Sequence, residues 1–139
     1  MANAIRVRWG WLKFMYIYTI VVAGGCGLGM IVVPNIVAST FGLPYQDPVG
    51  FGIVGSVYLA FGVSSLLGLR APLKFVPVLL LQLCYKAIWF VGLVLPLLVK
   101  GQFPSYAIPI AIIFATYVIG DLIAIPFPYL LSCTAQKGE

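Results

Sequence analysis

Residues 75–99 read FVPVLLLQLCYKAIWFVGLVLPLLV, and Lys86 is the one charged residue among them. A helix needs about 20 mostly apolar residues to cross a bilayer, so this stretch predicts a transmembrane helix. Lipid offers no partner to backbone polar groups, so the comparable apolar runs elsewhere are also expected to be helical. The predicted spans cover residues 14–39, 50–69, 75–99 and 106–131. We therefore expect an all-α membrane protein, a four-transmembrane-helix bundle that forms one domain over residues 1–139.

Prolines near the end of the fourth run affect its predicted helix. Pro126 and Pro128 fall late in residues 106–131. A proline inside a helix removes a backbone hydrogen bond and clashes with the preceding turn. We expect these two residues to kink or end the fourth helix.

The composition excludes a soluble globular protein. Hydrophobic residues make up 63% of the 139 residues, charged residues make up 8%, and the mean hydropathy is +1.12, whereas soluble domains carry about 25% charged residues. The net charge of +5 comes without a long basic tract, so we expect no nucleic-acid partner. The chain has no histidine, which excludes the usual Ser-His-Asp triad and most catalytic zinc sites. Its three cysteines form no C-x-x-C motif, and we expect neither a metal nor a cofactor.

Basic residues predict the orientation of the spans. The segments on one side of the predicted bundle hold six of them, and the other side holds only Lys100. Loops rich in lysine and arginine stay in the cytoplasm, so both termini are predicted to be cytoplasmic. The six residues are Arg6, Arg8, Lys13, Arg70, Lys74 and Lys137.

Small residues recur at every fourth position in two of the predicted spans. This spacing lets helix backbones approach closely in lipid. We therefore expect these residues to pack the first span against the second, or to form an oligomer interface. The residues are Gly25 and Gly29 in the first span, and Gly52, Ser56, Ala60, Ser64 and Gly68 in the second.

Two residues of opposite charge lie deep in the third and fourth spans. Lys86 lies about 16 Å from the predicted start of its span, and Asp121 about 15 Å from the predicted end of its own, at ~1.5 Å per residue. The spans run in opposite directions, so the two depths match. A charge at this depth is costly unless it faces protein or a partner. We expect Lys86 and Asp121 to meet, although the two side chains could also stay apart.

Aromatic and polar residues surround this predicted pair. Gln82, Tyr85 and Trp89 share one face of the third helix with Lys86. Tyr117 shares a face with Asp121, and the second span offers Tyr58. These residues predict a polar, aromatic-lined ligand site, with Lys86 supplying charge. The alternative interpretation is a structural ion pair that only fixes helix register.

Part of the chain resembles a known group of proteins. The stretches GLRAPLK, over residues 68–74, and QLCYKAIW, over residues 82–89, are similar to small uncharacterised bacterial four-helix membrane proteins near the DoxX-like and BphX-like groups. The resemblance covers about a third of the chain. It implies a bacterial inner-membrane protein and assigns no activity or catalytic residue.

Three functions remain open from the sequence. The first is a site that binds or passes a small lipophilic or charged ligand, in a chain that forms homo-oligomers. The second is a non-catalytic accessory subunit of a larger membrane complex. The third is an enzyme acting on a lipophilic substrate, in which Lys86 would be a base or form a Schiff base. The motifs of any named reaction are missing, so an enzyme is the least favoured of the three.

Overall fold

The computed structural model describes residues 5–44 and 47–133, and every regular element in these ranges is helical. In this part of the chain, four stretches are long and apolar enough to cross a membrane, which confirms the four predicted helical spans. They run over Trp9–Val32, Pro48–Arg70, Val76–Val99 and Ser105–Ala124. In chain order the elements are α1 (Trp9–Thr19), the π-helical turn η1 (Ile20–Gly24), α2 (Gly25–Val32), α3 (Pro34–Phe41), α4 (Pro48–Arg70), α5 (Val76–Trp89), the π-helical turn η2 (Phe90–Val94), α6 (Leu95–Val99), the 3-10 turn η3 (Ser105–Ala107), α7 (Ile108–Ala124) and α8 (Phe127–Cys133).

The predicted borders of the first and fourth spans are wrong by up to two turns. The first span begins at Trp9 and ends at Val32, not at residues 14 and 39. The fourth ends at Ala124, not at residue 131, which agrees with the expectation that Pro126 kinks or ends this helix. Val33 and Ile125 leave the helical conformation because each precedes a proline, which disfavours helical backbone in the residue before it. The apolar residues beyond these breaks form the separate short helices α3 and α8.

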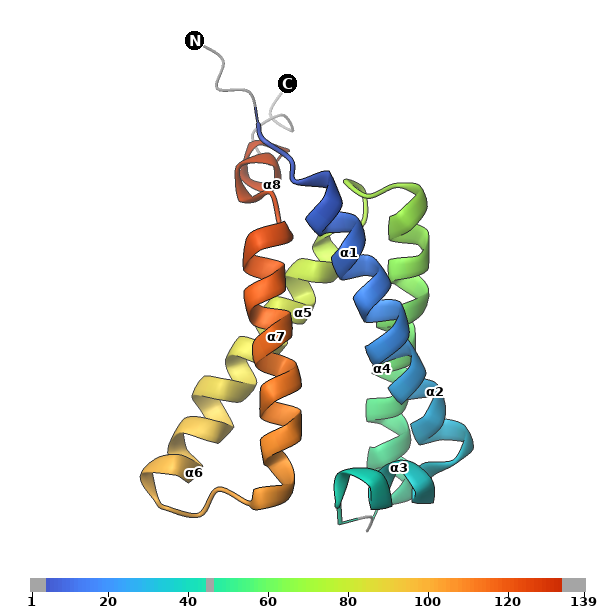
Figure 1. Ribbon diagram of the computed structural model, residues 1–139, viewed down its shortest axis with the longest axis vertical. Helices are drawn as coiled ribbons and strands as arrows, with labels where there is room; N and C mark the ends of the chain where they lie inside the picture. The colour runs from blue at the N-terminus through green and yellow to red at the C-terminus, as the bar shows by residue number, and fades with distance from the viewer. Residues whose placement is uncertain (1–4, 45–46, 134–139) are drawn as a thin grey trace.

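Two glycines close helices at the same end of the molecule. Gly42 follows α3 and Gly101 follows α6, with φ angles of 64° and 65°. Backbone bonds complete both turns, from Leu43 N to the Ala38 carbonyl at 2.8 Å and from Gln102 N to the Leu97 carbonyl at 2.9 Å. Only glycine adopts this left-handed backbone at little cost. The two turns place α3 and α6 on either side of the open end of the molecule (Figure 1).

The four spans form two pairs that diverge toward that end. The α1–α2 span packs along α4, and α5 packs along α7. The pairs join through contacts of α1 with α7 and of α4 with α5. Figure 1 shows the two pairs splayed apart at the end that holds α3 and α6. A wedge therefore separates the pairs over part of their length.

Glycines allow the α1–α2 span to touch α4 at backbone distance. A Cβ added to Gly62 would lie 2.6 Å from the Cα of Gly24, and one added to Gly27 would lie 2.5 Å from the carbonyl oxygen of Gly55. No side chain fits at these crossings. Close backbone approach of this kind drives helix association in lipid, where apolar burial alone favours no partner.

The small-residue row predicted on the second span does not form this seam. Ser56 and Ala60 are exposed, Ser64 is half-buried, and a Cβ at Gly52 would meet nothing within 4 Å. The crossing instead uses Gly55 and Gly62, which lie on another face of α4. Several overlapping rows of small residues occur in this helix, and the longest row is not the one that forms the backbone crossing with the first span.

Of the remaining predicted packing residues, Gly25 and Gly29 do not contact the second span, whereas Gly68 contacts the first. A Cβ at Gly25 would meet nothing within 4 Å, so this residue lies off the seam. A Cβ at Gly29 would lie 3.0 Å from a methyl group of Val37 in α3, not from the second span. Gly68 does contact the first span, because a Cβ there would lie 2.5 Å from the ring of Tyr16.

Tyr16 ties α1 to the turn between α4 and α5. Its ring occupies the space that Gly68 leaves, and its hydroxyl donates a 2.6 Å hydrogen bond to the Pro72 carbonyl. It belongs to the hydrophobic core that joins the two helix pairs at their converging end. The buried residues of this core are Leu12, Met15, Tyr16, Val76, Leu79, Tyr117, Ala124 and Ile125.

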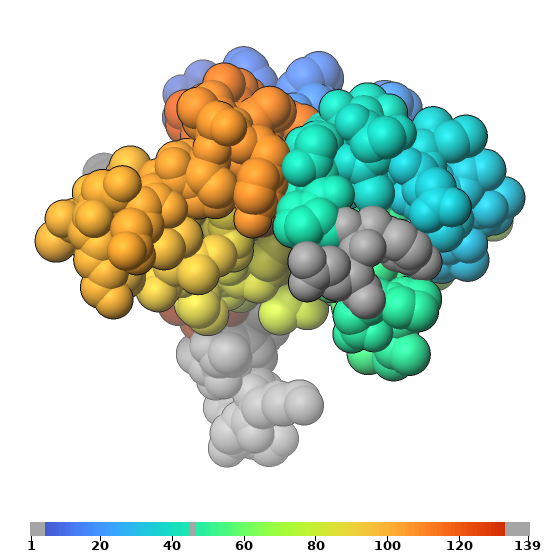
Figure 2. All heavy atoms as spheres, turned by 90° about the horizontal axis from the view of Figure 1, so that it is seen from below, coloured from blue at the N-terminus to red at the C-terminus, as the bar shows by residue number. Residues whose placement is uncertain are grey.

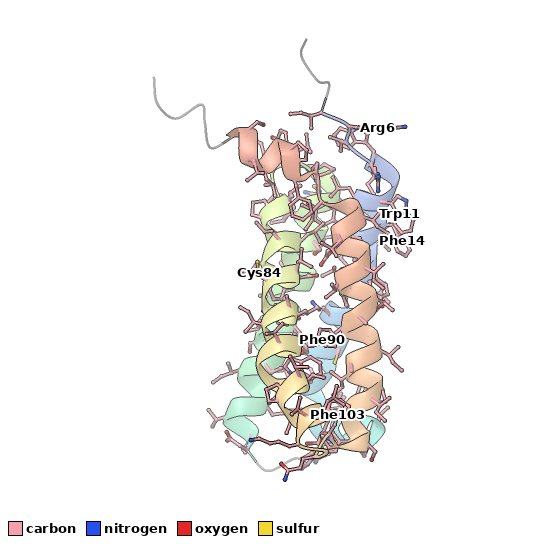
Figure 3. The ribbon with its side chains drawn as sticks, turned by 90° about the vertical axis from the view of Figure 1, so that its left-hand side faces the viewer. Arg6, Trp11, Phe14, Cys84, Phe90 and Phe103 are labelled. Atoms are coloured by element: carbon pink, nitrogen blue, oxygen red, sulfur yellow. The ribbon has the colours of Figure 1, made fainter. Side chains whose placement is uncertain are left out.

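Most of the described basic residues outside the middle of the spans lie at one end of the molecule. Arg6, Arg8 and Lys13 lie just before or within the first turns of α1. Arg70 and Lys74 lie in or next to the turn between α4 and α5, at the same end of the molecule. Lys100 lies at the opposite end, after α6. Figure 3 shows Arg6 and Trp11 at the first end and Phe103 at the other. Lys137, which is also counted in the predicted charge asymmetry, lies outside the described residues.

Candidate functional site

A cleft of about 770 Å³ lies in the wedge between the two helix pairs. Its walls come from η1, α2 and α4 on one side and from α5, η2 and α7 on the other. Phe41, Leu43 and Phe103 line it near the open end, whereas Tyr85, Lys86 and Tyr117 line its inner end. Figure 2 looks into the open end, where yellow-green atoms of the third span are visible between the orange and teal walls. Small-molecule sites in proteins enclose about 300–1,000 Å³, so the cleft has the size of one ligand.

Lys86 is the one charged side chain among the described residues that line the cleft. Only 1% of its surface is exposed. Its Nζ donates a 2.9 Å hydrogen bond to the hydroxyl of Tyr85. An ammonium group has three N–H donors, and this hydroxyl is the one acceptor that the described residues give it. Lys86 therefore places a largely unpaired cation at the closed end of an apolar cleft.

Three aromatic rings surround the ammonium. Nζ of Lys86 lies 4.1 Å from the ring centre of Tyr117, 4.2 Å from that of Tyr85 and 5.3 Å from that of Phe114. A cation within about 6 Å of a ring centre is attracted by the negative face of the ring. This attraction replaces part of the hydration that the ammonium loses on burial, and it leaves the remaining N–H donors free.

Further aromatic contacts hold these rings in place. Phe61 of α4 stacks on Tyr85, with ring centres 5.5 Å apart. Trp89 meets Phe114 edge to face at 5.0 Å, and Tyr85 meets the same ring at 6.0 Å. The inner end of the cleft is thus built by three spans at once, and none of them forms the site alone.

Asp121 lies behind the cleft and not in it. It is fully buried, one helical turn beyond Tyr117, and it does not line the cleft. Both of its carboxyl oxygens lack a hydrogen-bond partner, so Asp121 and Lys86 form no direct ion pair. The predicted match in depth used residue 131 as the border of the fourth span. Because α7 ends at Ala124, Asp121 is close to the end of its helix.

Other buried polar groups among the described residues are also incompletely bonded. The hydroxyl of Thr19 lies 2.8 Å from the Met15 carbonyl and 3.3 Å from Oε1 of Gln82, so one proton serves two acceptors. Nε2 of Gln82 and Oγ of Ser65 have no partner. A buried polar group without a partner costs about 1–3 kcal/mol. This part of the molecule is therefore not arranged for stability alone.

Two π-helical turns flank the inner half of the cleft. The turn Ile20–Gly24 contributes Val22 and Ala23 to the lining, and the turn Phe90–Val94 follows directly after Trp89. Pro96 explains the second turn, because proline cannot donate the hydrogen bond that would continue a regular α-helix. Such turns re-aim neighbouring side chains and occur frequently at functional sites.

The structure gathers most, but not all, of the predicted site residues. Tyr58, Tyr85, Lys86, Trp89 and Tyr117 line one cleft. Gln82 and Asp121 are buried one turn deeper and do not reach it.

The sequence analysis missed several residues of the site. Cys26 lines the cleft and was not among the predicted site residues. Phe61 supports Tyr85, and Ile110 contributes to the wall from α7. Apolar residues of this kind carry no sequence signal, because most other residues of the predicted spans are apolar as well.

Within the described residues, no cluster of histidine, cysteine, aspartate and glutamate could hold a metal ion. What the cleft offers chemically is a long apolar surface, one buried cation and the hydroxyls of Tyr58, Tyr85 and Tyr117. Comparison of the chain with protein-family models, with curated proteins and with solved structures finds no match. The arrangement of the site is therefore interpreted from its own residues.

Proposed function

We propose that this chain is an integral membrane protein of the bacterial inner membrane that binds, or passes, a small lipophilic ligand in the cleft next to Lys86. The observation that supports this most strongly is the buried ammonium at the inner end of a ligand-sized apolar cleft. A charge inside a membrane span is costly and typically marks a substrate or ion site. Here the cation is aimed into a cavity, and the acid behind it gives it no direct ion pair.

The proposed orientation places the start of α1, the turn between α4 and α5, and α8 in the cytoplasm. Exposed Arg6, Arg8, Arg70 and Lys74 at that end support it, because basic residues are retained on the cytoplasmic side. The mouth of the cleft then opens toward the outer half of the bilayer. A ligand would reach it from the outer leaflet or from the periplasm.

Native mass spectrometry of the protein purified in mild detergent tests this function. Wild type is expected to carry a lipophilic molecule. Replacing Ile110 by tryptophan fills the wall of the cleft and is expected to displace that molecule. Replacing Ile112 by tryptophan is the matched control. Ile112 lies on the same helix but faces away from the cleft, and 60% of its surface is exposed.

The outcomes separate this function from an accessory subunit. A bound molecule that Ile110→Trp removes and Ile112→Trp retains supports the proposal. If wild type carries only detergent, or if both variants retain the molecule equally, the cleft is not a binding site. A protein that carries no small molecule and co-purifies with another membrane protein would favour the accessory-subunit alternative, with the exposed row of Ser56 and Ala60 as a contact face.

A further inference from the structure

The chemistry of the cleft narrows the class of ligand. We infer that the cleft takes a single-chain lipophilic monoanion, such as a long-chain carboxylate, with its charged head at Lys86 and its chain running toward Phe103. This inference rests on the ligand-binding function proposed above and adds the charge, the number of chains and the direction of the ligand.

The charge of the ligand follows from the charge of the lining. Lys86 is the one ionic side chain among the described lining residues, and it is a cation. Two of its three N–H donors point to no acceptor in the structure. A carboxylate supplies two acceptor oxygens and forms hydrogen bonds with an ammonium that are about twice as strong as neutral ones. A monoanion is favoured over a dianion, because one cation cannot balance two charges in a site removed from water.

The direction of the ligand follows from the shape of the cleft. Along the third span the lining extends from Lys86 through Leu93 to Leu97, which is about 16 Å at ~1.5 Å per residue. This length is about half of the ~30 Å hydrocarbon thickness of a bilayer. The wall beyond Lys86 is apolar up to the mouth, where Phe103 and Pro104 lie. A chain therefore fits with its polar end inward and its apolar end toward the mouth.

The size of the cleft limits the number of chains. Its volume of about 770 Å³ lies within the range of sites for single small molecules. At the inner end the rings of Tyr85, Phe114 and Tyr117 all lie within 5.3 Å of the ammonium and occupy much of the space around it. A two-chain phospholipid would have to place its bulky diester head at this narrow end, so we infer one chain.

Replacing Asp121 provides a second test of whether the ligand is an anion. Asp121 is buried one turn behind Tyr117, whose ring lies 4.1 Å from Nζ of Lys86, and among the described residues its carboxyl oxygens have no partner. An anionic ligand and Asp121 then compete for the same cation. Removing the acid with the isosteric change Asp121→Asn is expected to tighten binding of a carboxylate, whereas removing the cation weakens it.

The experiment compares palmitic acid with hexadecanol, which has the same chain length and no charge. Both are titrated into the purified full chain in detergent at neutral pH, and the bound fraction is measured. Wild type is expected to bind the acid at least about tenfold more tightly than the alcohol, because only the carboxylate forms charge-assisted hydrogen bonds with the ammonium. Lys86→Met is expected to abolish this preference, and Asp121→Asn is expected to increase it. Lys74→Met removes the same charge at an exposed site and is expected to keep the preference.

Each result decides the inference. Equal binding of acid and alcohol by wild type, or a preference that survives in Lys86→Met, overturns the anionic assignment while leaving a lipophilic site in place. Tight binding of dipalmitoyl phosphatidylglycerol without binding of palmitic acid overturns the single-chain assignment. Weaker binding of the acid to Asp121→Asn contradicts the competition between ligand and Asp121. If palmitic acid does not bind although native mass spectrometry finds another molecule in the cleft, only this inference fails. An empty cleft in that measurement removes the proposed function itself.

Discussion

Replacing Gly27 by alanine is expected to lower the free energy of unfolding by about 3 kcal/mol or more, which is the upper part of the usual cost of overpacking. The added Cβ would lie 2.5 Å from the Gly55 carbonyl oxygen and 2.9 Å from Cβ of Tyr58. Both obstacles belong to or sit next to the backbone of α4, so no side-chain rotation relieves them. The first two spans must move apart, and one wall of the cleft moves with them. Thermal unfolding in detergent, followed by circular dichroism, measures this change.

Gly25→Ala is the matched control for this prediction. Gly25 lies two residues away in the same span, and a Cβ there meets nothing within 4 Å. Alanine is favoured over glycine inside a helix by about 1 kcal/mol, so this variant is expected to be as stable as the wild type or more stable. Equal stability of the Gly27 and Gly25 variants would show that the two spans do not cross where the structure places them.

The double variant Lys86→Met with Asp121→Leu is expected to be at least as stable as the wild type, and by up to about 4 kcal/mol more stable. Both side chains are buried, the carboxyl group has no hydrogen-bond partner, and no ion pair joins the two groups. Apolar residues of similar size need no partner in this environment. The same variant is expected to lose its preference for an anionic ligand. The two polar residues would then be retained for binding and not for stability.

The two single variants complete this test. Each one leaves the other ionisable group buried without its opposite charge, so each single variant is expected to be less stable than the double variant. A double-mutant cycle in detergent, with the same unfolding measurement, gives the coupling between the two sites. A double variant that is clearly less stable than the wild type would mean that Lys86 and Asp121 are a structural pair.

The four spans could be predicted from the sequence because lipid imposes a strong and simple constraint. Every backbone polar group must be bonded within its own segment, so a long apolar run is a helix. The break at Ile125 agrees with the expectation that Pro126 kinks or ends the fourth helix. The border at Val33 was harder to predict, because apolar residues continue past it on both sides. The prolines that follow these residues carry the signal, and the break at residue 33 was missed because Pro34 was read as part of the span.

The candidate site could be predicted only in part. The depth of Lys86 and the stripe of Tyr85, Trp89 and Tyr117 follow from helical periodicity along each span. Which faces meet depends on the rotation of one helix against another, and that rotation is set by contacts such as the one between Gly27 and Gly55. The sequence therefore indicated a cluster of polar and aromatic residues. It did not indicate that Lys86 would face a cleft while Asp121 lies behind it.

The most direct test of the cleft as a binding site uses its own tryptophan. Trp89 lines the cleft, whereas Trp9 is exposed at the far end of the first span. In a variant with Trp9 and Trp11 changed to phenylalanine, Trp89 is the one remaining tryptophan, and bromine-labelled palmitic acid is expected to quench its fluorescence to saturation. A variant that keeps only Trp9 is expected to show weak quenching that does not saturate. Equal, non-saturating quenching of both variants would mean that the acid only dissolves in the micelle, which would contradict a ligand site in the cleft at Lys86.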